Sequence, residues 1–363
     1  MMTKGYLFRF LVLCFFAVVL IQPFWAADKK RNTRPKIGLV LGGGGAKGAA
    51  EVGVLKYIEK AGIPIDYIAG TSIGSIVGGL YSTGFRSADL DTLFHSQQWL
   101  NLLSDRHDSL SSHIYSVRDS VAYVFGFPIK HLKKKAKGSE KHSHKVGLMR
   151  GDSIQNLLAK LSGKEDSMSF DALPIPFRCV AVDIRQMKEV VFSNGKLPFA
   201  MRASMSIPGV FQPLERDSML LVDGGMLNNL PVDVVRAMGA DIVIAIDLTQ
   251  NKRNEHNDIV TPKAMSPEVK SQFKRMLLWL KERPDLTKYH ANVQAADIYI
   301  NPNLKGYSAA DFKPKKIAEM IEQGEKAGQS AMPQLRKLAR DLQKYDKKSA
   351  KKSTKKRATI RKR

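Results

Sequence analysis

The stretch from Lys36 to Ser75 constrains the fold of this chain more than any other. An apolar run over residues 37–41 leads into four glycines and then into a helical pattern over residues 49–60. A second apolar run follows and ends on the turn Gly70–Gly74. Apolar runs that end on glycine and alternate with amphipathic helices are typical of buried parallel strands. The stretch therefore predicts the first strand–helix–strand unit of an α/β fold.

The rest of the chain continues this alternation. Further strands are predicted over residues 177–182, 189–192, 220–222, 242–248 and 296–300, and helices over 75–81, 151–161, 232–238 and 313–344. We therefore predict a three-layer α/β/α fold with a largely parallel central sheet. This domain spans residues 36–343, with its core motifs in 36–248 and its C-terminal completion in 266–343. Mixed helical patterns over 86–128 predict a variable cap over the site.

The first 27 residues are predicted to be an export signal. Two basic residues precede an almost wholly apolar run over residues 10–21, and Ala26-Ala27 offers small residues for cleavage. This pattern predicts an exported protein that is periplasmic, outer-membrane-associated or secreted. Because bulky Phe24 or Trp25 occupies the position three residues before the cleavage point, an uncleaved N-terminal anchor is the alternative. Residues 28–35 are polar and basic and predict a linker.

Positive charge is concentrated in two segments. The chain has a formal net charge of +24; residues 344–363 hold eleven Lys and Arg against one Asp, and residues 130–145 hold seven Lys against one Glu. We predict that 344–363 is a basic disordered tail and that 130–145 is an exposed loop, in which a solvated His142 and His144 are preferred to a metal site. Such segments attract polyanions, although a merely solvated tail is the simpler interpretation. No nucleic acid is expected, because the chain shows no nucleic-acid motif.

The glycine loop and the serine turn each indicate a site. Gly43, Gly45 and Gly48 fit the G-x-G-x-x-G pattern of a dinucleotide site, but that site needs an acid at the end of the second strand. Residues 70–74 stand there instead, and they fit G-x-S-x-G, the tight turn that exposes a serine hydroxyl. Ser72 is therefore the candidate nucleophile. A nucleotide-binding Rossmann-type protein is the alternative.

Asp223 is the candidate general base. It follows the predicted strand at 220–222 and precedes two glycines, so its carboxylate can reach Ser72 from a strand end. Burial at the bottom of a cleft is expected to raise its pKa toward that of a useful base. None of the eight histidines follows a strand in a glycine-marked turn, which is where a triad histidine would stand.

Together these motifs resemble those of the patatin-like phospholipase family. The matching stretches are Gly42–Gly48 (GGGGAKG), Gly70–Gly74 (GTSIG), Ala203–Pro213 (ASMSIPGVFQP), Asp223–Pro231 (DGGMLNNLP) and Gly239–Leu248 (GADIVIAIDL). The resemblance covers roughly residues 36–330 and leaves out the export signal and the tail. Lys47 stands where many members have Arg, which keeps the charge but loses the planar guanidinium.

The resemblance implies a serine lipid acyl hydrolase, of phospholipase A or lysophospholipase type, with a Ser–Asp dyad. Ser72 would attack the ester carbonyl of a phospholipid or lysophospholipid, with Asp223 as general base, and water would then hydrolyse the acyl-serine. Backbone N–H groups of Gly43, Gly44 and Gly45 would hold the oxyanion. Supporting roles would fall to Lys47, Gly48, Gly70, Gly74, Gly224 and Gly225.

The resemblance also implies what surrounds the reaction. It calls for no cofactor and no metal, and no obligate protein partner is evident. The basic segments would bring the protein to an anionic membrane surface. A catalytically idle lipid-binding protein is the remaining alternative, because an intact dyad in the sequence does not by itself show an open site.

Overall fold

The computed structural model describes residues 34–105, 122–124, 127–129, 149–163, 167–250 and 284–360. Several predicted features lie outside these residues: the export signal, most of the linker, the basic segment 130–145 with His142 and His144, and the first part of the C-terminal completion. Residues 35–339 form one compact unit, and the described part of the other unit is Arg34 together with residues 340–360.

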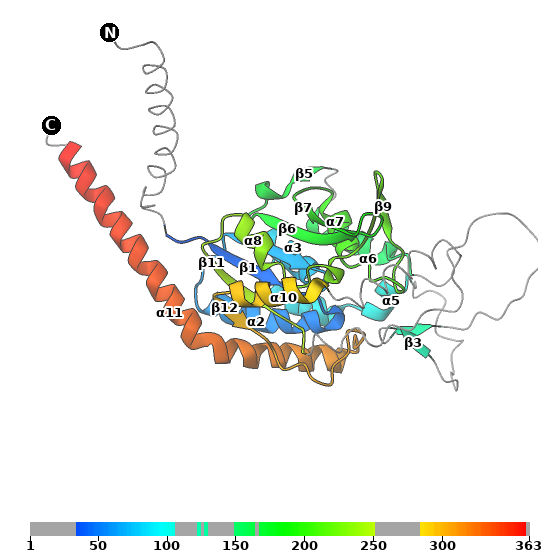
Figure 1. Ribbon diagram of the computed structural model, residues 1–363. Coiled ribbons are helices and arrows are strands. Elements are labelled where there is room, and N and C mark those ends of the chain that lie inside the picture. The colour runs from blue at the N-terminus through cyan, green and yellow to red at the C-terminus, as the bar shows by residue number, and fades with distance from the viewer. Residues whose placement is uncertain are drawn as a thin grey trace, which may run out of the picture. The chain divides into compact units, whose positions relative to one another are not determined.

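The compact unit is built on one mixed sheet with the strand order β12-β11-β1-β2-β6-β10-β9 (Figure 1). Five neighbouring strands run parallel to one another: β12 (Ile298–Ile300), β11 (Ile242–Ile246), β1 (Ile37–Leu41), β2 (Tyr67–Thr71) and β6 (Phe177–Asp183). β1 is entirely buried, as its unbroken apolar sequence predicts. The predicted α/β fold with a largely parallel sheet is confirmed.

The sheet becomes antiparallel beyond β6. β10 (Met219–Asp223) pairs with one edge of β6, β7 (Lys188–Phe192) pairs with β6 as its hairpin partner, and β9 (Leu214–Arg216) pairs with β10. Two small sheets lie outside this one: β5 (Met168–Ser169) with β8 (Asn194–Gly195), and β3 (Ala122–Val124) with β4 (Phe127–Ile129).

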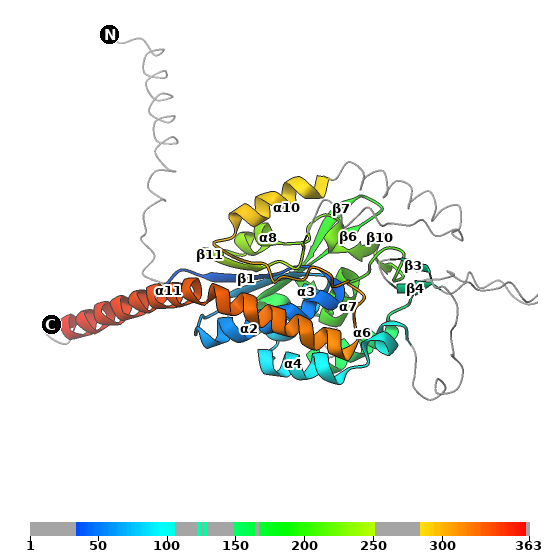
Figure 2. The same ribbon diagram turned by 90° about the horizontal axis from the view of Figure 1, so that it is seen from below.

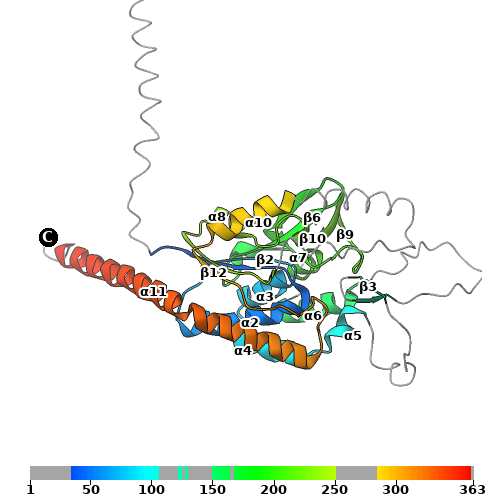
Figure 3. The ribbon, with the colours of Figure 1, turned by 60° about the horizontal axis from the view of Figure 1, so that its bottom comes forward.

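Helices cover both faces of the sheet (Figures 2 and 3). On one face α8 (Val232–Ala237) packs on β1, β2 and β11, and α10 (Pro284–Ala295) packs on α8. On the other face α3 (Ile73–Ser82) packs on β1, β2 and β6, flanked by α2 (Ala49–Lys60) and α7 (Leu197–Ser204). Outside this layer lie α4 (Ser87–Ser96), α5 (Trp99–Leu103), α6 (Asp152–Ser162) and residues 314–339 of α11 (Pro314–Ile360).

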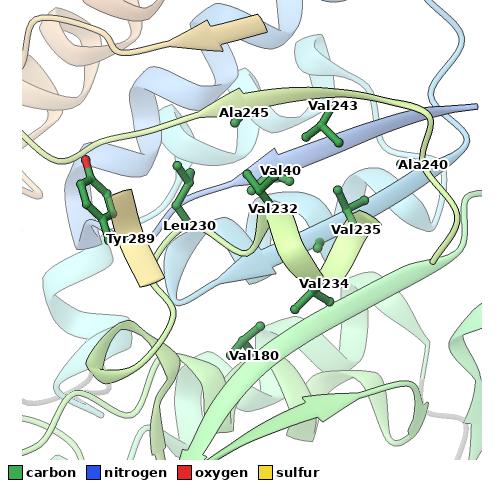
Figure 4. Packing of buried hydrophobic residues seen from close by; sticks show 11 residues of the cluster. Val40, Val180, Leu230, Val232, Val234, Val235, Ala240, Val243, Ala245 and Tyr289 are labelled. Carbon is green, nitrogen blue, oxygen red and sulfur yellow. The ribbon is translucent and has the colours of Figure 1, made fainter. Parts of the chain in front are cut away.

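An apolar cluster joins the sheet to α8 (Figure 4). Small and branched side chains of the strands meet valines of α8, together with two residues of the adjoining loops and a tyrosine of α10. All of them are buried: Val40, Ala69, Val180, Leu230, Val232, Val234, Val235, Ala240, Val243, Ala245 and Tyr289. Because valines fill little space, α8 lies close to the sheet. The segment that precedes α8 is thereby held against the carboxyl ends of β1 and β2, where the candidate site lies.

Glycines set the distance between α2 and α11. A methyl group on Gly53 would lie 2.2 Å from the Ile321 carbonyl oxygen, and one on Gly324 would lie 1.9 Å from the Ala50 carbonyl oxygen. The two helix backbones are therefore in direct contact. Lys56 adds an ion pair to Glu325 at 2.7 Å.

Two local predictions differ from the structure, and one helix is capped by a residue that the sequence does not indicate. The sequence predicts disorder from residue 344, but α11 continues to Ile360, because Lys, Ala and Arg favour a helix even where no apolar face requires one. Helix α6 is capped from a distance: the Asp105 carboxylate accepts from the N–H groups of Gly151 and Ser153, both at 2.7 Å. Within 86–128, α4 and α5 confirm the helical pattern, whereas residues 122–124 form a strand.

Candidate active site

Ser72 lies at the sharp turn between β2 and α3. Its backbone has φ 55° and ψ −125°, a conformation that residues other than glycine rarely adopt. Such a conformation costs on the order of 1–3 kcal/mol. The flanking glycines make the turn possible: a methyl group on Gly70 would lie 2.3 Å from the Gly74 carbonyl oxygen, and one on Gly74 would lie 2.3 Å from the Leu41 carbonyl oxygen. The predicted serine turn is therefore present, with its strain concentrated on Ser72.

The Ser72 hydroxyl donates a hydrogen bond to Asp223. The distance from Ser72 Oγ to Asp223 Oδ2 is 2.6 Å, typical of a hydroxyl that donates to a carboxylate. The other carboxylate oxygen, Oδ1, accepts from the Gly225 N–H at 2.7 Å, which fixes the plane of the carboxylate. Both side chains are almost buried, with exposures of 5% for Ser72 and 6% for Asp223. A hydroxyl that donates to a fixed carboxylate is the arrangement of a nucleophile with its base.

Strand β6 brings the two residues to the same level. β7 pairs along one edge of β6, so β2 and β10 share the other edge, where Thr71 pairs with Val180 and Asp223 pairs with the next residue, Ala181. Because β2 runs parallel to β6 and β10 runs antiparallel to it, the carboxyl ends of β2 and β10 face each other along this edge. The side chains of Ser72 and Asp223 meet where these two strand ends meet.

Ser204, at the end of α7, supports the strained turn. Its Oγ accepts from the Ser72 N–H at 2.9 Å and donates to the Val180 carbonyl oxygen at 2.5 Å. The Ser75 hydroxyl donates to the Ser72 carbonyl oxygen at 2.6 Å, so both backbone polar groups of Ser72 are satisfied. The sequence places Ser204 in a block near the site but does not predict this role. Its position within that small-residue block is the only signal for it.

The glycine loop lies beside the nucleophile. A methyl group on Gly43 would lie 3.2 Å from the Ser72 Cβ, so the loop backbone is in contact with Ser72. The N–H of Gly43 donates to the Asn229 carbonyl oxygen at 3.1 Å, which corrects the prediction that it serves the oxyanion. The N–H groups of Gly44 and Gly45 donate to no protein acceptor within the described ranges. These two groups are the donors that the loop offers to a ligand.

The other predicted support residues hold the loop and the turns in place. Gly45 has φ 57°, and a methyl group there would lie 2.4 Å from the Ala309 carbonyl oxygen. The N–H of Lys47, whose side chain is half-buried, donates to the Gly44 carbonyl oxygen at 3.2 Å. Added methyl groups would also collide at Gly48 (2.2 Å from Ile73 Cγ1), Gly224 (2.2 Å from the Val180 carbonyl oxygen) and Gly225 (2.6 Å from Asn229 Oδ1).

A buried carboxyl lies behind the glycine loop. Glu51, in the first turn of α2, is fully buried, and its carboxyl oxygens have no hydrogen-bond partner of ordinary geometry. Burial raises the pKa of Glu51 well above its usual value and outweighs the effect of the nearby Gly42 N–H; the charge of Asp247 raises the pKa further. Burial therefore favours the protonated form of Glu51, although the N-terminus of a helix otherwise favours a carboxylate.

The histidines within the described ranges have partners of their own. His95 is exposed and pairs with Asp91 at 3.1 Å, and the ring of His290 contacts that of Tyr289. Across the described part of the chain, no group of three or more His, Cys, Asp or Glu side chains is placed to hold a metal ion. None of the described helices is both long and apolar enough to cross a membrane.

The chain belongs to the patatin-like phospholipase family, whose model matches residues 39–236, more than half of its length. A patatin-like phospholipase domain-containing protein of Caenorhabditis elegans is 29% identical over 335 residues, which are 86% of this chain and 22% of that protein. An uncharacterized NTE family protein of Mycobacterium tuberculosis is 31% identical over 62% of this chain and 53% of that protein. Human patatin-like phospholipase domain-containing protein 6 is 35% identical over 58% of this chain and 13% of that protein.

The chain thus spans about half or less of the length of these curated relatives. Among solved structures, that of VipD from Legionella pneumophila is similar, with a TM-score of 0.47, 14% identity and coverage of 83% of this chain and 67% of that chain. The family resemblance predicted from the motifs is confirmed. Membership supports assignment to the lipid hydrolases as a class.

Proposed function

We propose that this protein is a serine acyl hydrolase that cleaves carboxylic esters of phospholipids or lysophospholipids with a Ser72–Asp223 dyad. The observation that carries the proposal is the 2.6 Å hydrogen bond from the Ser72 hydroxyl to a carboxylate that the Gly225 N–H holds in place. The strained turn holds this hydroxyl beside the glycine loop, so nucleophile, base and oxyanion donors occupy one place.

The first half of the reaction is transfer of the acyl group to Ser72. Asp223 accepts the hydroxyl proton as Ser72 Oγ attacks the ester carbonyl carbon. The carbonyl oxygen becomes negatively charged, and the N–H groups of Gly44 and Gly45 stabilise it. When the C–O bond of the ester breaks, the proton held by Asp223 passes to the leaving alcohol. This alcohol is a lysophospholipid when the substrate is a phospholipid, and the glycerol with its phosphate headgroup when the substrate is a lysophospholipid.

The second half regenerates the enzyme. Asp223 accepts a proton from water, whose oxygen attacks the acyl-serine, and the same N–H groups stabilise the second oxyanion. The proton then returns to Ser72 Oγ as the fatty acid leaves. Two successive uses of one carboxylate require that it stay close to Ser72, which the β6 register and the Gly225 N–H provide.

The substrate class follows from the family and from the distribution of charge. Relatives named for a patatin-like phospholipase domain support a lipid ester as substrate. The net charge of +24 and the basic segment 344–363 suit an anionic lipid surface, where each Lys or Arg contributes about 1 kcal/mol of attraction. An export signal in the first 27 residues would place the enzyme in the periplasm, at the outer membrane or outside the cell.

Fatty-acid release from a panel of lipids tests the proposal. Phospholipids, lysophospholipids and p-nitrophenyl esters are incubated with the wild type and with Ser72→Ala. The proposal predicts release by the wild type from at least one lipid and none above background by the variant. A fluorophosphonate probe should label the wild type and not Ser72→Ala. Equal release by both proteins, or labelling that persists in the variant, would refute Ser72 as the nucleophile.

A further inference from the structure

We propose that the Asn229 side chain is a positioning residue that aims the Gly44 N–H, and that it does so by holding the peptide between Gly43 and Gly44. This inference rests on the proposed function, because it assigns the orientation of an oxyanion donor to a residue that does not itself touch the substrate. The juxtaposition that carries it is a double hydrogen bond between Asn229 and Gly43.

Asn229 binds Gly43 on both sides. Its backbone carbonyl oxygen accepts from the Gly43 N–H at 3.1 Å, and its side-chain Nδ2 donates to the Gly43 carbonyl oxygen at 3.2 Å. The first contact fixes the peptide that enters Gly43 and the second fixes the peptide that leaves it. The planar peptides on both sides of Gly43 are thereby held, which restricts the φ and ψ of a glycine that would otherwise be very flexible.

The second contact determines where Gly44 can donate. The Gly43 carbonyl and the Gly44 N–H belong to one planar trans peptide, so the N–H points away from the carbonyl oxygen. Holding the carbonyl toward Asn229 therefore turns the Gly44 N–H to the opposite side. That N–H is one of the two loop groups that donate to no protein acceptor among the described residues. A carbonyl that accepts a hydrogen bond also polarises its peptide, which strengthens the N–H as a donor.

Asn229 is itself anchored from behind. Its Nδ2 also donates to Thr249 Oγ1 at 3.3 Å, and the Thr249 N–H donates to Asp247 Oδ1 at 3.0 Å. Asp247 is fully buried and accepts from the Tyr299 hydroxyl at 2.8 Å and from the Tyr289 hydroxyl. The Asn229 amide is thus held by residues that follow β11, and these residues are themselves held by the buried Asp247.

The amide oxygen occupies the space that two of the motif glycines leave open. A methyl group on Gly43 would lie 2.3 Å from Asn229 Oδ1, and one on Gly225 would lie 2.6 Å from it. Gly225 also donates to the Asp223 carboxylate. The Asn229 side chain therefore packs between the glycine loop and the turn that carries the base, and it sets the distance between the oxyanion donors and the dyad.

The experiment compares Asn229→Ala and Asn229→Asp with a matched control, Asn228→Ala. Asn228 is a neighbouring buried asparagine whose amide forms hydrogen bonds with Glu189, Asp233 and Asn292. Among the described residues, no hydrogen bond joins this amide to the glycine loop. For both Asn229 variants we expect kcat and the rate of fluorophosphonate labelling to fall about 10- to 100-fold, with KM within about threefold of the wild-type value. A misdirected donor should cause part of the rate loss that follows when one oxyanion donor is removed. Asn228→Ala should lose at least as much thermal stability and keep kcat within about threefold.

A second measurement does not depend on activity. In protein labelled with ¹⁵N-glycine, the Gly44 amide resonance is assigned by its disappearance in Gly44→Ala. We expect this resonance to shift in Asn229→Ala and to stay in place in Asn228→Ala. An unmoved resonance, kcat unchanged in Asn229→Ala, or equal losses of kcat in the Asn229 and Asn228 variants would overturn the inference. If the wild type shows no Ser72-dependent hydrolysis, the proposed function fails, and the resonance alone then decides the positioning role.

Discussion

Replacing Glu51 by Gln should stabilise the protein, and more so as the pH rises. In the folded state burial raises the pKa of Glu51 well above its value of 4.5 in an unfolded chain. The folded protein therefore holds this proton at pH values where the unfolded chain has released it, so the wild type loses stability as the pH rises from 4.5 toward the raised pKa. The loss amounts to about 1.4 kcal/mol for each pH unit in this window. The amide introduced by Glu51→Gln has the shape of the protonated carboxyl and does not titrate, so the variant lacks this loss.

Urea denaturation at pH 5, 6 and 7 measures the effect as the difference in unfolding free energy between the two proteins. Near pH 4.5 the difference should be within about 1 kcal/mol, since one neutral group replaces another. It should then grow in favour of Glu51→Gln. The control is Glu322→Gln, an exposed residue paired with Lys326, for which the difference should stay within about 1 kcal/mol at every pH. A difference for Glu51→Gln that is constant with pH, or that favours the wild type at pH 7, would show that Glu51 is ionised in the fold and would refute the reasoning.

Three other perturbations address the site and the tail. Gly45→Ala should lower kcat more than it raises KM in a steady-state assay, because the φ of 57° and the nearby Ala309 carbonyl oxygen force the loop to move. The control is Gly62→Ala, where φ is 69° and the space around the residue is open, and it should leave kcat and KM unchanged. Ser204→Ala leaves the buried Ser72 N–H without its acceptor, so it should reduce the unfolding free energy by about 1–3 kcal/mol and also lower kcat. The control Ser82→Ala removes a hydrogen bond to the Gly79 carbonyl oxygen and should reduce the unfolding free energy without lowering kcat. Removing residues 344–363 should leave turnover of a soluble short-chain ester unchanged and weaken salt-sensitive sedimentation with anionic vesicles; equal sedimentation of both proteins would reduce the tail to a solvated appendage.

The sequence predicts the elements of the site that steric rules govern. Ser72 and Asp223 each stand at the end of an apolar run next to glycines, and those glycines are required because a methyl group at Gly70, Gly74 or Gly224 would collide with backbone. Such requirements are local, so a single sequence displays them. The order of the motifs then suffices to identify the family.

What the sequence does not predict depends on contacts between segments that lie far apart in the chain. Asp105 caps helix α6 by binding Gly151, 46 residues further along the chain, and Asn229 reaches back 186 residues to Gly43. Neither pairing follows from spacing or periodicity. The assignment of Gly43 as an oxyanion donor was wrong for the same reason, because the Asn229 carbonyl oxygen that occupies its N–H arrives from another part of the chain.

The central claim is that Ser72 and Asp223 act as one unit, and a double-mutant comparison tests it most directly. Values of kcat/KM for the preferred ester are measured for the wild type, Ser72→Ala, Asp223→Asn and the double variant, each with a melting temperature to show that it is folded. The account predicts a loss of at least about 10³-fold in each single variant and a double variant no worse than the worse single one. An Asp223→Asn variant that keeps most of its activity, or losses that multiply in the double variant, would contradict the dyad.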